Sequence, residues 1–182
     1  MLLFLMASST LVAQQQQITL EEIWSGKFST EGLDVLRSLK NGKEYAVLNF
    51  NRHNRSTTVD VYDYKSGEKV RTLLNTATMN GIDRVVSYQF NSDESQILFA
   101  TNRTPIYRRS SIGTYYVYDI NTEEFRLVSP HKIQEPTFSN DGSKIAYGFE
   151  NNLYIKDLVS GATQQVTTDG KKNQIINGIA DW

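Results

Sequence analysis

The stretch that decides the fold is 138–161, FSNDGSKIAYGFENNLYIKDLVSG. It begins with turn residues at 140–142, where Asn and Asp tolerate a left-handed backbone and Gly adopts one freely. Hydrophobic side chains then alternate along one strand and mark a second strand, before Ser160 and Gly161 turn the chain again. These hydrophobic residues are Ile145, Tyr147 and Phe149, followed by Leu153, Ile155 and Leu158. With a further strand at 163–167, the stretch predicts a four-stranded β-meander.

Two earlier stretches have the same organisation, so the chain is a repeat array. The turn residues Asn41, Asp93 and Asp141 precede the alternating segments and lie 52 and 48 residues apart. These spacings are close to the roughly 40–50 residues of one four-stranded propeller blade. The pattern predicts an all-β fold, a partial β-propeller of four-stranded antiparallel blades with a short N-terminal helix. An ordinary antiparallel sandwich with similar turns is the alternative that the pattern leaves open.

The repeats also predict where the domains begin and end. An incomplete propeller is expected over 33–182, with blades at about 33–76, 82–130 and 133–169 and the start of a fourth at 171–182. A lead-in helix is expected at 18–26. Its start fits a capping box, in which the Thr19 hydroxyl and the Glu22 carboxylate each accept a hydrogen bond from a backbone N–H of the first turn.

Residues 1–13, MLLFLMASSTLVA, are typical of the end of a secretory signal peptide, because a short apolar block precedes small residues suited to cleavage. The basic region expected before such a block is absent. A transmembrane helix needs roughly 20 apolar residues, and this stretch ends at the glutamines 14–17, so no stable membrane anchor is expected. The segment predicts an exported protein, periplasmic or extracellular, with a buried N-terminal segment as the alternative.

The composition is that of a globular protein without a strong charge bias. The 182 residues include 19 basic and 20 acidic side chains, and 39% are hydrophobic. A chain without a basic excess is not expected to bind nucleic acid. No cysteine is present, which excludes disulfides and thiolate metal sites but does not exclude export.

The second repeat carries an insertion that the third lacks. Its strand-end aspartate follows its turn residue by 26 positions, against 16 in the third repeat and 22 in the first. The extra residues form a loop at 101–113, on the face that also carries the links between blades, where repeat proteins often place binding residues. The loop contains Arg108 and Arg109, and an Arg side chain can hold a carboxylate or carbonyl through two hydrogen bonds. The alternative is that both arginines are solvated surface residues without a binding role.

No catalytic or metal-binding constellation is visible in the sequence. The only histidines, His53 and His131, have no likely ligand nearby and are expected in surface loops. The chain has no G-x-S-x-G elbow, no P-loop and no Gly-rich dinucleotide motif. No metal and no cofactor are therefore predicted.

The order and content of three motifs resemble those of a known family. They are the entry ITLEEIW at 18–24, the run YRRS at 107–110 followed by YYVYD at 115–119, and the ending INGIADW at 176–182. Together they are similar to the N-terminal β-propeller of dipeptidyl peptidase IV-like proteins, in the prolyl oligopeptidase class of serine peptidases. The resemblance covers about 18–182 and implies truncation after about three blades.

The resemblance implies a role in binding peptides. In the family, the propeller covers an α/β-hydrolase domain that carries Ser, Asp and His, and restricts entry to peptides. A pair of glutamates holds the substrate's amino terminus, and an arginine contacts the peptide backbone. The arginine corresponds to Arg108, with Tyr107 in place of the family's tryptophan and Arg109 at a position that need not touch substrate. The glutamates would follow Trp182.

The resemblance thus implies a propeller fragment that gates and helps to position the peptide substrate of an exopeptidase that removes N-terminal dipeptides. The catalytic C-terminal α/β-hydrolase domain would lie outside the chain. The resemblance therefore leaves open whether this segment should be classed as an enzyme. A homodimer of the parent protein is also compatible with the resemblance. The alternative from another class is a stand-alone periplasmic propeller that scaffolds protein–protein contacts. A different propeller peptidase of the same class is less compatible with the ending at 177–182.

Overall fold

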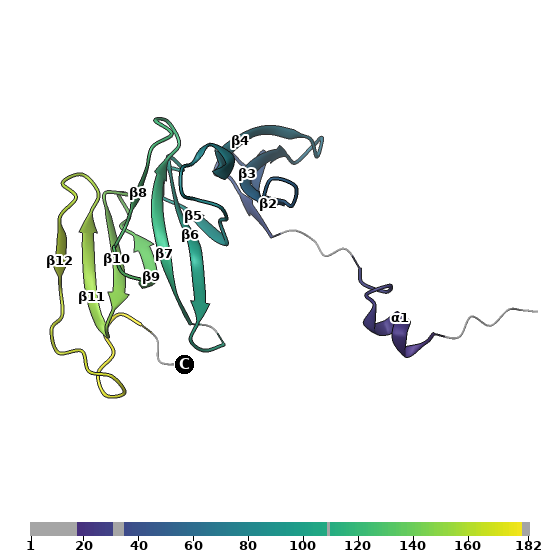
Figure 1. Ribbon diagram of the computed structural model, residues 1–182. Coiled ribbons are helices and arrows are strands. Elements are labelled where there is room, and N and C mark those ends of the chain that lie inside the picture. The colour runs from purple at the N-terminus through teal and green to yellow at the C-terminus, as the bar shows by residue number, and fades with distance from the viewer. Residues whose placement is uncertain (1–17, 31–34, 109, 180–182) are drawn as a thin grey trace, which may run out of the picture. The chain divides into compact units, whose positions relative to one another are not determined.

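Twelve strands form three antiparallel sheets within the residues that the computed structural model describes, 18–30, 35–108 and 110–179 (Figure 1). Each sheet has four strands that are hydrogen-bonded in chain order, so each is a meander. The first sheet contains β1 (Leu36–Ser38), β2 (Glu44–Asn51), β3 (Ser56–Asp63) and β4 (Lys69–Asn75). The second contains β5 (Ser87–Phe90), β6 (Gln96–Pro105), β7 (Ser111–Asp119) and β8 (Phe125–Leu127). The third contains β9 (Gln134–Phe138), β10 (Lys144–Phe149), β11 (Asn152–Asp157) and β12 (Thr163–Gln165).

The second sheet is buried on both faces, because it packs against the first sheet on one side and the third on the other. Successive side chains of its strands point to these opposite sides. On β6, Ile97 and Phe99 belong to a core cluster shared with the first sheet, whereas Leu98 belongs to a cluster shared with the third. All three side chains are almost completely buried. Three meanders packed in succession are the arrangement of propeller blades. The all-β prediction with four-stranded antiparallel blades is confirmed, and the sandwich alternative is wrong.

The turns that define the repeat in the sequence share one hydrogen-bonding pattern. At the third turn of each sheet, an aspartate Oδ1 accepts two backbone N–H groups: Asp63, Asp119 and Asp157 play this part. For Asp63 the two distances are 2.9 and 2.8 Å. Hydrogen bonding by the backbone N–H of Ser66 lowers the pKa of Asp63, because it favours the charged carboxylate. The aspartate at the strand end therefore stabilises the turn that follows it, through hydrogen bonds to the backbone of that turn.

Neighbouring sheets are also joined through their first turns. The backbone N–H of Lys40 donates to Glu94 Oε1 at 2.9 Å, and the ammonium group of Lys40 donates to the carbonyl of Ser92. In the same way, Ser92 Oγ donates to the carbonyl of Asn140 at 2.5 Å. The equivalent turns of the three repeats are thus linked one to the next, and their side chains help to set the spacing of the sheets.

Gly142 occupies the tightest of these turns and leads to a stability prediction. Both Gly142 and Gly42 have positive φ, at +71° and +66°. A Cβ on Gly142 would lie 2.8 Å from Asn91 Nδ2, whereas a Cβ on Gly42 would meet nothing within 4 Å. We expect Gly42→Ala to cost about 1 kcal/mol for its backbone conformation alone, and Gly142→Ala to cost about 2–3 kcal/mol because Asn91 must also move. Urea unfolding of both variants tests this difference, which equal losses would contradict.

The helix lies in a separate unit of the chain, 1–33, whereas the sheets lie in the unit 34–182. Helix α1 (Leu20–Trp24) has Thr19 as its N-cap, and both hydrogen bonds of the capping box are present. The predicted short N-terminal helix with this cap is confirmed. The expected signal peptide at 1–13 lies outside the described residues. Of the helices in the described part of the chain, none is long and apolar enough to cross a membrane.

Candidate functional site

The insertion of the second repeat forms a long hairpin and not the loop that was expected. β6 and β7 remain paired beyond the body of the sheet, with Arg103 opposite Gly113 and Pro105 opposite Ser111, after a register shift between Ala100 and Arg103. β6 ends at Pro105 and β7 begins at Ser111. The expectation of a loop over 101–113 was wrong because polar residues occupy both faces here, so the alternation that marks a half-buried strand is missing. Backbone pairing nevertheless continues.

The predicted binding residues lie at the tip of this hairpin. The backbone N–H groups of Ile106 and Tyr107 donate to the carbonyl of Ser110, at 2.8 and 3.2 Å, and close the turn. The Tyr107 side chain is 78% exposed. Arg108 is also exposed, and it has no hydrogen bond or ion pair with any residue that the structure describes. Arg109 lies outside the described residues.

The base of the hairpin is held on two sides. Nε and Nη2 of Arg103 both donate to Ser111 Oγ, at 3.0 and 2.7 Å, which joins the two strands through side chains. Gly113 exchanges two backbone hydrogen bonds with Ile133, at 3.0 and 2.9 Å, in the link to the third sheet. Since Ile133 is completely buried, this contact ties the hairpin to the core. The exposed tip therefore projects from a fixed base, and the sequence contained no signal for the Gly113–Ile133 contact.

The end of the described chain runs along the same edge of the sheets as the hairpin tip. The second turns of neighbouring meanders lie on one edge, and in Figure 1 the β6–β7 and β10–β11 turns lie at the same end. Asn177 donates from its backbone N–H to the carbonyl of Asn151, in the β10–β11 turn, at 3.0 Å. Its side chain donates to Asp169 Oδ1 at 3.0 Å. A chain that continues past this segment would thus start from the edge that carries Arg108.

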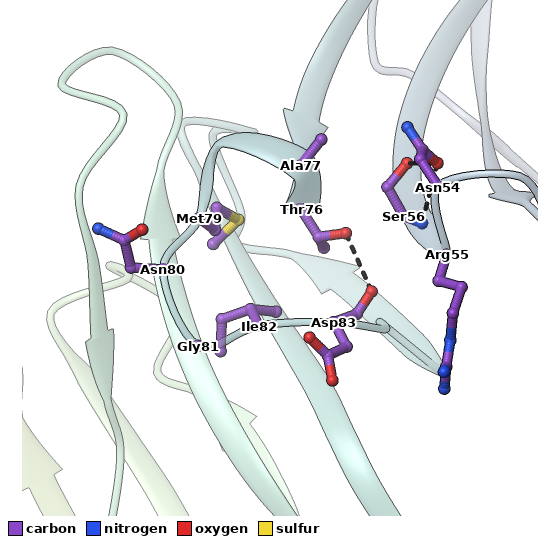
Figure 2. Close-up of a pocket in the computed structure, with 10 residues that line it drawn as sticks. All are labelled: Asn54, Arg55, Ser56, Thr76, Ala77, Met79, Asn80, Gly81, Ile82 and Asp83. Atoms are coloured by element: carbon purple, nitrogen blue, oxygen red, sulfur yellow. Dashed lines mark hydrogen bonds between the residues drawn. The ribbon is translucent and has the colours of Figure 1, made fainter.

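A cavity of about 400 Å³ lies between the β2–β3 turn and the link from the first sheet to the second (Figure 2). As Figure 2 shows, Thr76 Oγ1 donates to the carbonyl of Asp83, at 3.2 Å, and Ser56 bonds to Asn54. Thr76 Oγ1 also accepts the backbone N–H of Thr57 at 2.8 Å. The Thr76 hydroxyl therefore holds the link in place, and the Ser56 hydroxyl bonds within the β2–β3 turn. Among the described residues they form no nucleophile–base pair.

The histidines and acidic residues form no metal site in the described part of the chain, where no group of three or more potential ligands lies together. His53 and His131 are both exposed. The His131 ring stacks on Phe149, with 4.5 Å between the ring centres and 12° between their planes. The imidazole ring of His131 thus packs on an aromatic side chain.

A second cavity, of about 300 Å³, lies where the first strands of the three sheets come together. Arg37 of β1, Tyr88 of β5 and Glu135 of β9 line it, together with Arg103 and Tyr115 of the long hairpin. Sequence reasoning did not find this group, because its members lie up to about a hundred positions apart and belong to different repeats. The only sequence signal that could have brought three of them together is the repeat spacing, which places Arg37, Tyr88 and Glu135 on the first strands of successive repeats.

Comparison with known proteins gives consistent matches. The family described as "Dipeptidyl peptidase IV (DPP IV) N-terminal region" matches residues 91–182. Prolyl endopeptidase FAP of Bos taurus is 31% identical over 91% of this chain, and dipeptidyl peptidase 4 of Bos taurus is 35% identical over 52%. These matches cover 21% and 13% of the two relatives, so the chain spans about a fifth or less of their length. The crystal structure of Porphyromonas gingivalis dipeptidyl peptidase 4 superimposes with a TM-score of 0.80 at 33% identity, over 92% of this chain and 24% of that one.

Proposed function

Because this chain belongs to the dipeptidyl peptidase IV N-terminal region family, we propose that it is the propeller part of a serine-type exopeptidase that removes dipeptides from the amino termini of peptides. The match to the family and the similarity to enzymes named dipeptidyl peptidase 4 support this proposal. An α/β-hydrolase domain would carry the catalytic residues and would be the partner of this segment. Export to the periplasm or the extracellular space, and a homodimer of the whole protein, belong to the same proposal.

The proposed role of this segment is to admit peptides and to hold their backbone, and Arg108 is the residue that would make the contact. The observation that carries the proposal is an exposed arginine without a described partner, on the tip of a hairpin whose base is fixed. A fixed base matters because a side chain held in position loses less entropy when it binds. The guanidinium group offers two parallel N–H donors to a peptide carbonyl. Tyr107 would shield that contact, and Arg109 would contribute less.

Arg108→Ala in the peptidase is expected to raise KM for a Gly-Pro amide about tenfold and to leave kcat nearly unchanged. A hydrogen bond from a charged donor contributes about 1.5–3 kcal/mol, and a contact made equally in the ground and transition states appears in KM. Steady-state kinetics of purified protein measures both constants. Arg52→Ala is the matched control, since Arg52 is an exposed arginine on the second turn of the first sheet. A KM for Arg108→Ala equal to that of the control would contradict the assigned role.

Sequencing the encoding DNA beyond the codon for Trp182 tests the wider proposal. An open frame that continues into paired glutamates, further blades and a G-x-S-x-G elbow would support it. A stop codon at that point would overturn the peptidase assignment for this product. A scaffold would then be the better explanation, and the protein would have no need of Arg108.

A further inference from the structure

The cavity between the first strands is bordered by exposed charged side chains that form no ion pair with any residue that the structure describes. Arg37, Arg103 and Glu135 line it, yet none of them takes part in the four ion pairs of the described residues. Arg103 uses Nε and Nη2 on Ser111, which leaves its other terminal nitrogen free of a described partner. Arg37 lies over the ring of Tyr88, with its Cζ 5.2 Å from the ring centre, and makes no described hydrogen bond. Two guanidinium groups and one carboxylate thus border one small space.

The walls of the cavity are partly apolar. Tyr88 is 6% exposed and Leu98 is almost completely buried, and both belong to the packed cores between the sheets. Gln89 Nε2 donates to the carbonyl of Pro136 at 2.9 Å and joins the first strands of the second and third sheets. Glu135 has a positive φ of 45°, which is an uncommon conformation for a residue with a side chain. The cavity is therefore lined by residues of three sheets, and a long-range hydrogen bond joins the second sheet to the third beside it.

The two tyrosines of the cavity remain neutral at physiological pH. Burial raises the pKa of Tyr88 to about 12, although the positive charge of Arg37 acts in the opposite direction. Burial also raises the pKa of Tyr115, with Arg103 lowering it and Glu135 raising it further. Arg103, Tyr115 and Glu135 all line the cavity. The fixed charges of the cavity come from its two arginines and its glutamate alone.

We propose that this cavity binds a free dipeptide in its zwitterionic form, with the carboxylate at Arg37 and Arg103 and the ammonium group at Glu135. The site is separate from Arg108, and the choice of a dipeptide rests on the proposed function, whose reaction releases one. Guanidinium groups bind carboxylates through paired hydrogen bonds, and a volume of about 300 Å³ is at the lower end of the range for small-ligand sites. Binding is reversible and involves no covalent step.

The proposal predicts that the full 182-residue chain binds Gly-Pro and discriminates against ligands that lack either charge. Isothermal titration calorimetry is carried out with Gly-Pro, its C-terminal amide and its N-acetyl derivative. Each modified ligand is expected to bind about tenfold or more weakly, since a charged hydrogen bond contributes about 1.5–3 kcal/mol. Arg37→Gln is expected to weaken Gly-Pro binding about tenfold, and Glu135→Gln is expected to abolish the preference for a free amino group. Circular dichroism and a thermal melt establish that each variant is folded.

Two further variants separate this site from the hairpin tip. Arg52→Gln is the control and should leave the affinity for Gly-Pro within about twofold of the unmodified chain, because Arg52 does not line the cavity. Arg108→Ala tests the hairpin tip, where the proposed function also places a peptide contact. If Arg108→Ala abolishes binding and Arg37→Gln does not, the dipeptide binds at the hairpin tip. The cavity proposal is then overturned, while the proposed role of Arg108 is supported. Absence of Gly-Pro binding to a folded chain, or equal binding of all three ligands, also overturns it, and leaves the kinetic test of Arg108 unaffected.

Discussion

Phe99→Ala is expected to lower the free energy of unfolding of this chain by about 4 kcal/mol, the largest effect of any substitution considered. Phe99 lies in the middle of β6 with none of its surface exposed. Its ring stacks on that of Tyr116, with 5.4 Å between the ring centres, and packs in the cluster between the first two sheets. Removing the ring loses its burial and leaves a cavity that neighbouring strands cannot fill.

Urea unfolding followed by tyrosine and tryptophan fluorescence measures this loss. Phe50→Ala is the matched control, because Phe50 is also a strand phenylalanine but is 42% exposed. Its ring lies against Arg84, at 4.7 Å from the guanidinium carbon, so a smaller loss of about 1 kcal/mol is expected. Similar losses for the two variants would mean that the packing of the first two sheets contributes little to stability.

Asp60→Asn is expected to cost about 3 kcal/mol at neutral pH, because it removes a buried charge that four side chains stabilise. Asp60 is 4% exposed. Its carboxylate pairs with the Lys69 ammonium group at 2.7 Å. It also accepts hydrogen bonds from the side chains of Thr72, Thr58 and Asn49, at 2.6, 2.7 and 2.8 Å. An amide in its place cannot accept all of these bonds and does not balance the charge of Lys69.

The effect of Asp60→Asn should depend on pH in a defined direction. Burial by itself would raise the pKa of Asp60, but the hydrogen bonds from Lys69, Thr72, Asn49 and Thr58 together lower it below the ordinary 3.8. A carboxyl group whose folded-state pKa is lowered stabilises the protein above its unfolded-state pKa, and this contribution is lost as the pH falls through the folded-state value. The difference in stability between the unmodified chain and Asp60→Asn should therefore shrink below about pH 4.

Urea titrations at neutral pH and at about pH 3 test this dependence. Asp83→Asn is the control, since Asp83 is exposed and its side chain has no hydrogen bond with a described residue. It should change stability by less than about 0.5 kcal/mol at either pH. A loss for Asp60→Asn that stays constant between the two pH values would show that its charge contributes little to stability.

Much of the fold follows from local patterns. Gly142 has the positive φ that its turn requires, and Asp141 accepts the backbone N–H of Ser143 in the same turn. Alternating hydrophobic residues on β10 face the core, with Ile145 and Tyr147 buried, because a pleated strand exposes successive side chains on opposite sides. The cap at Thr19 depends on residues three positions apart. All of these features are short-range, and a single sequence therefore predicts them.

The sequence by itself determined the class of strand, turn and cap, and the position of the insertion that carries Arg108. Tertiary structure alone decided that the insertion continues as paired strands, because its polar residues show no alternation and its base depends on Gly113 meeting Ile133. It also decided that Arg37 and Glu135 border one cavity, although 98 positions separate them. Such contacts form only when the sheets pack in succession, since packing brings together residues that no local pattern relates.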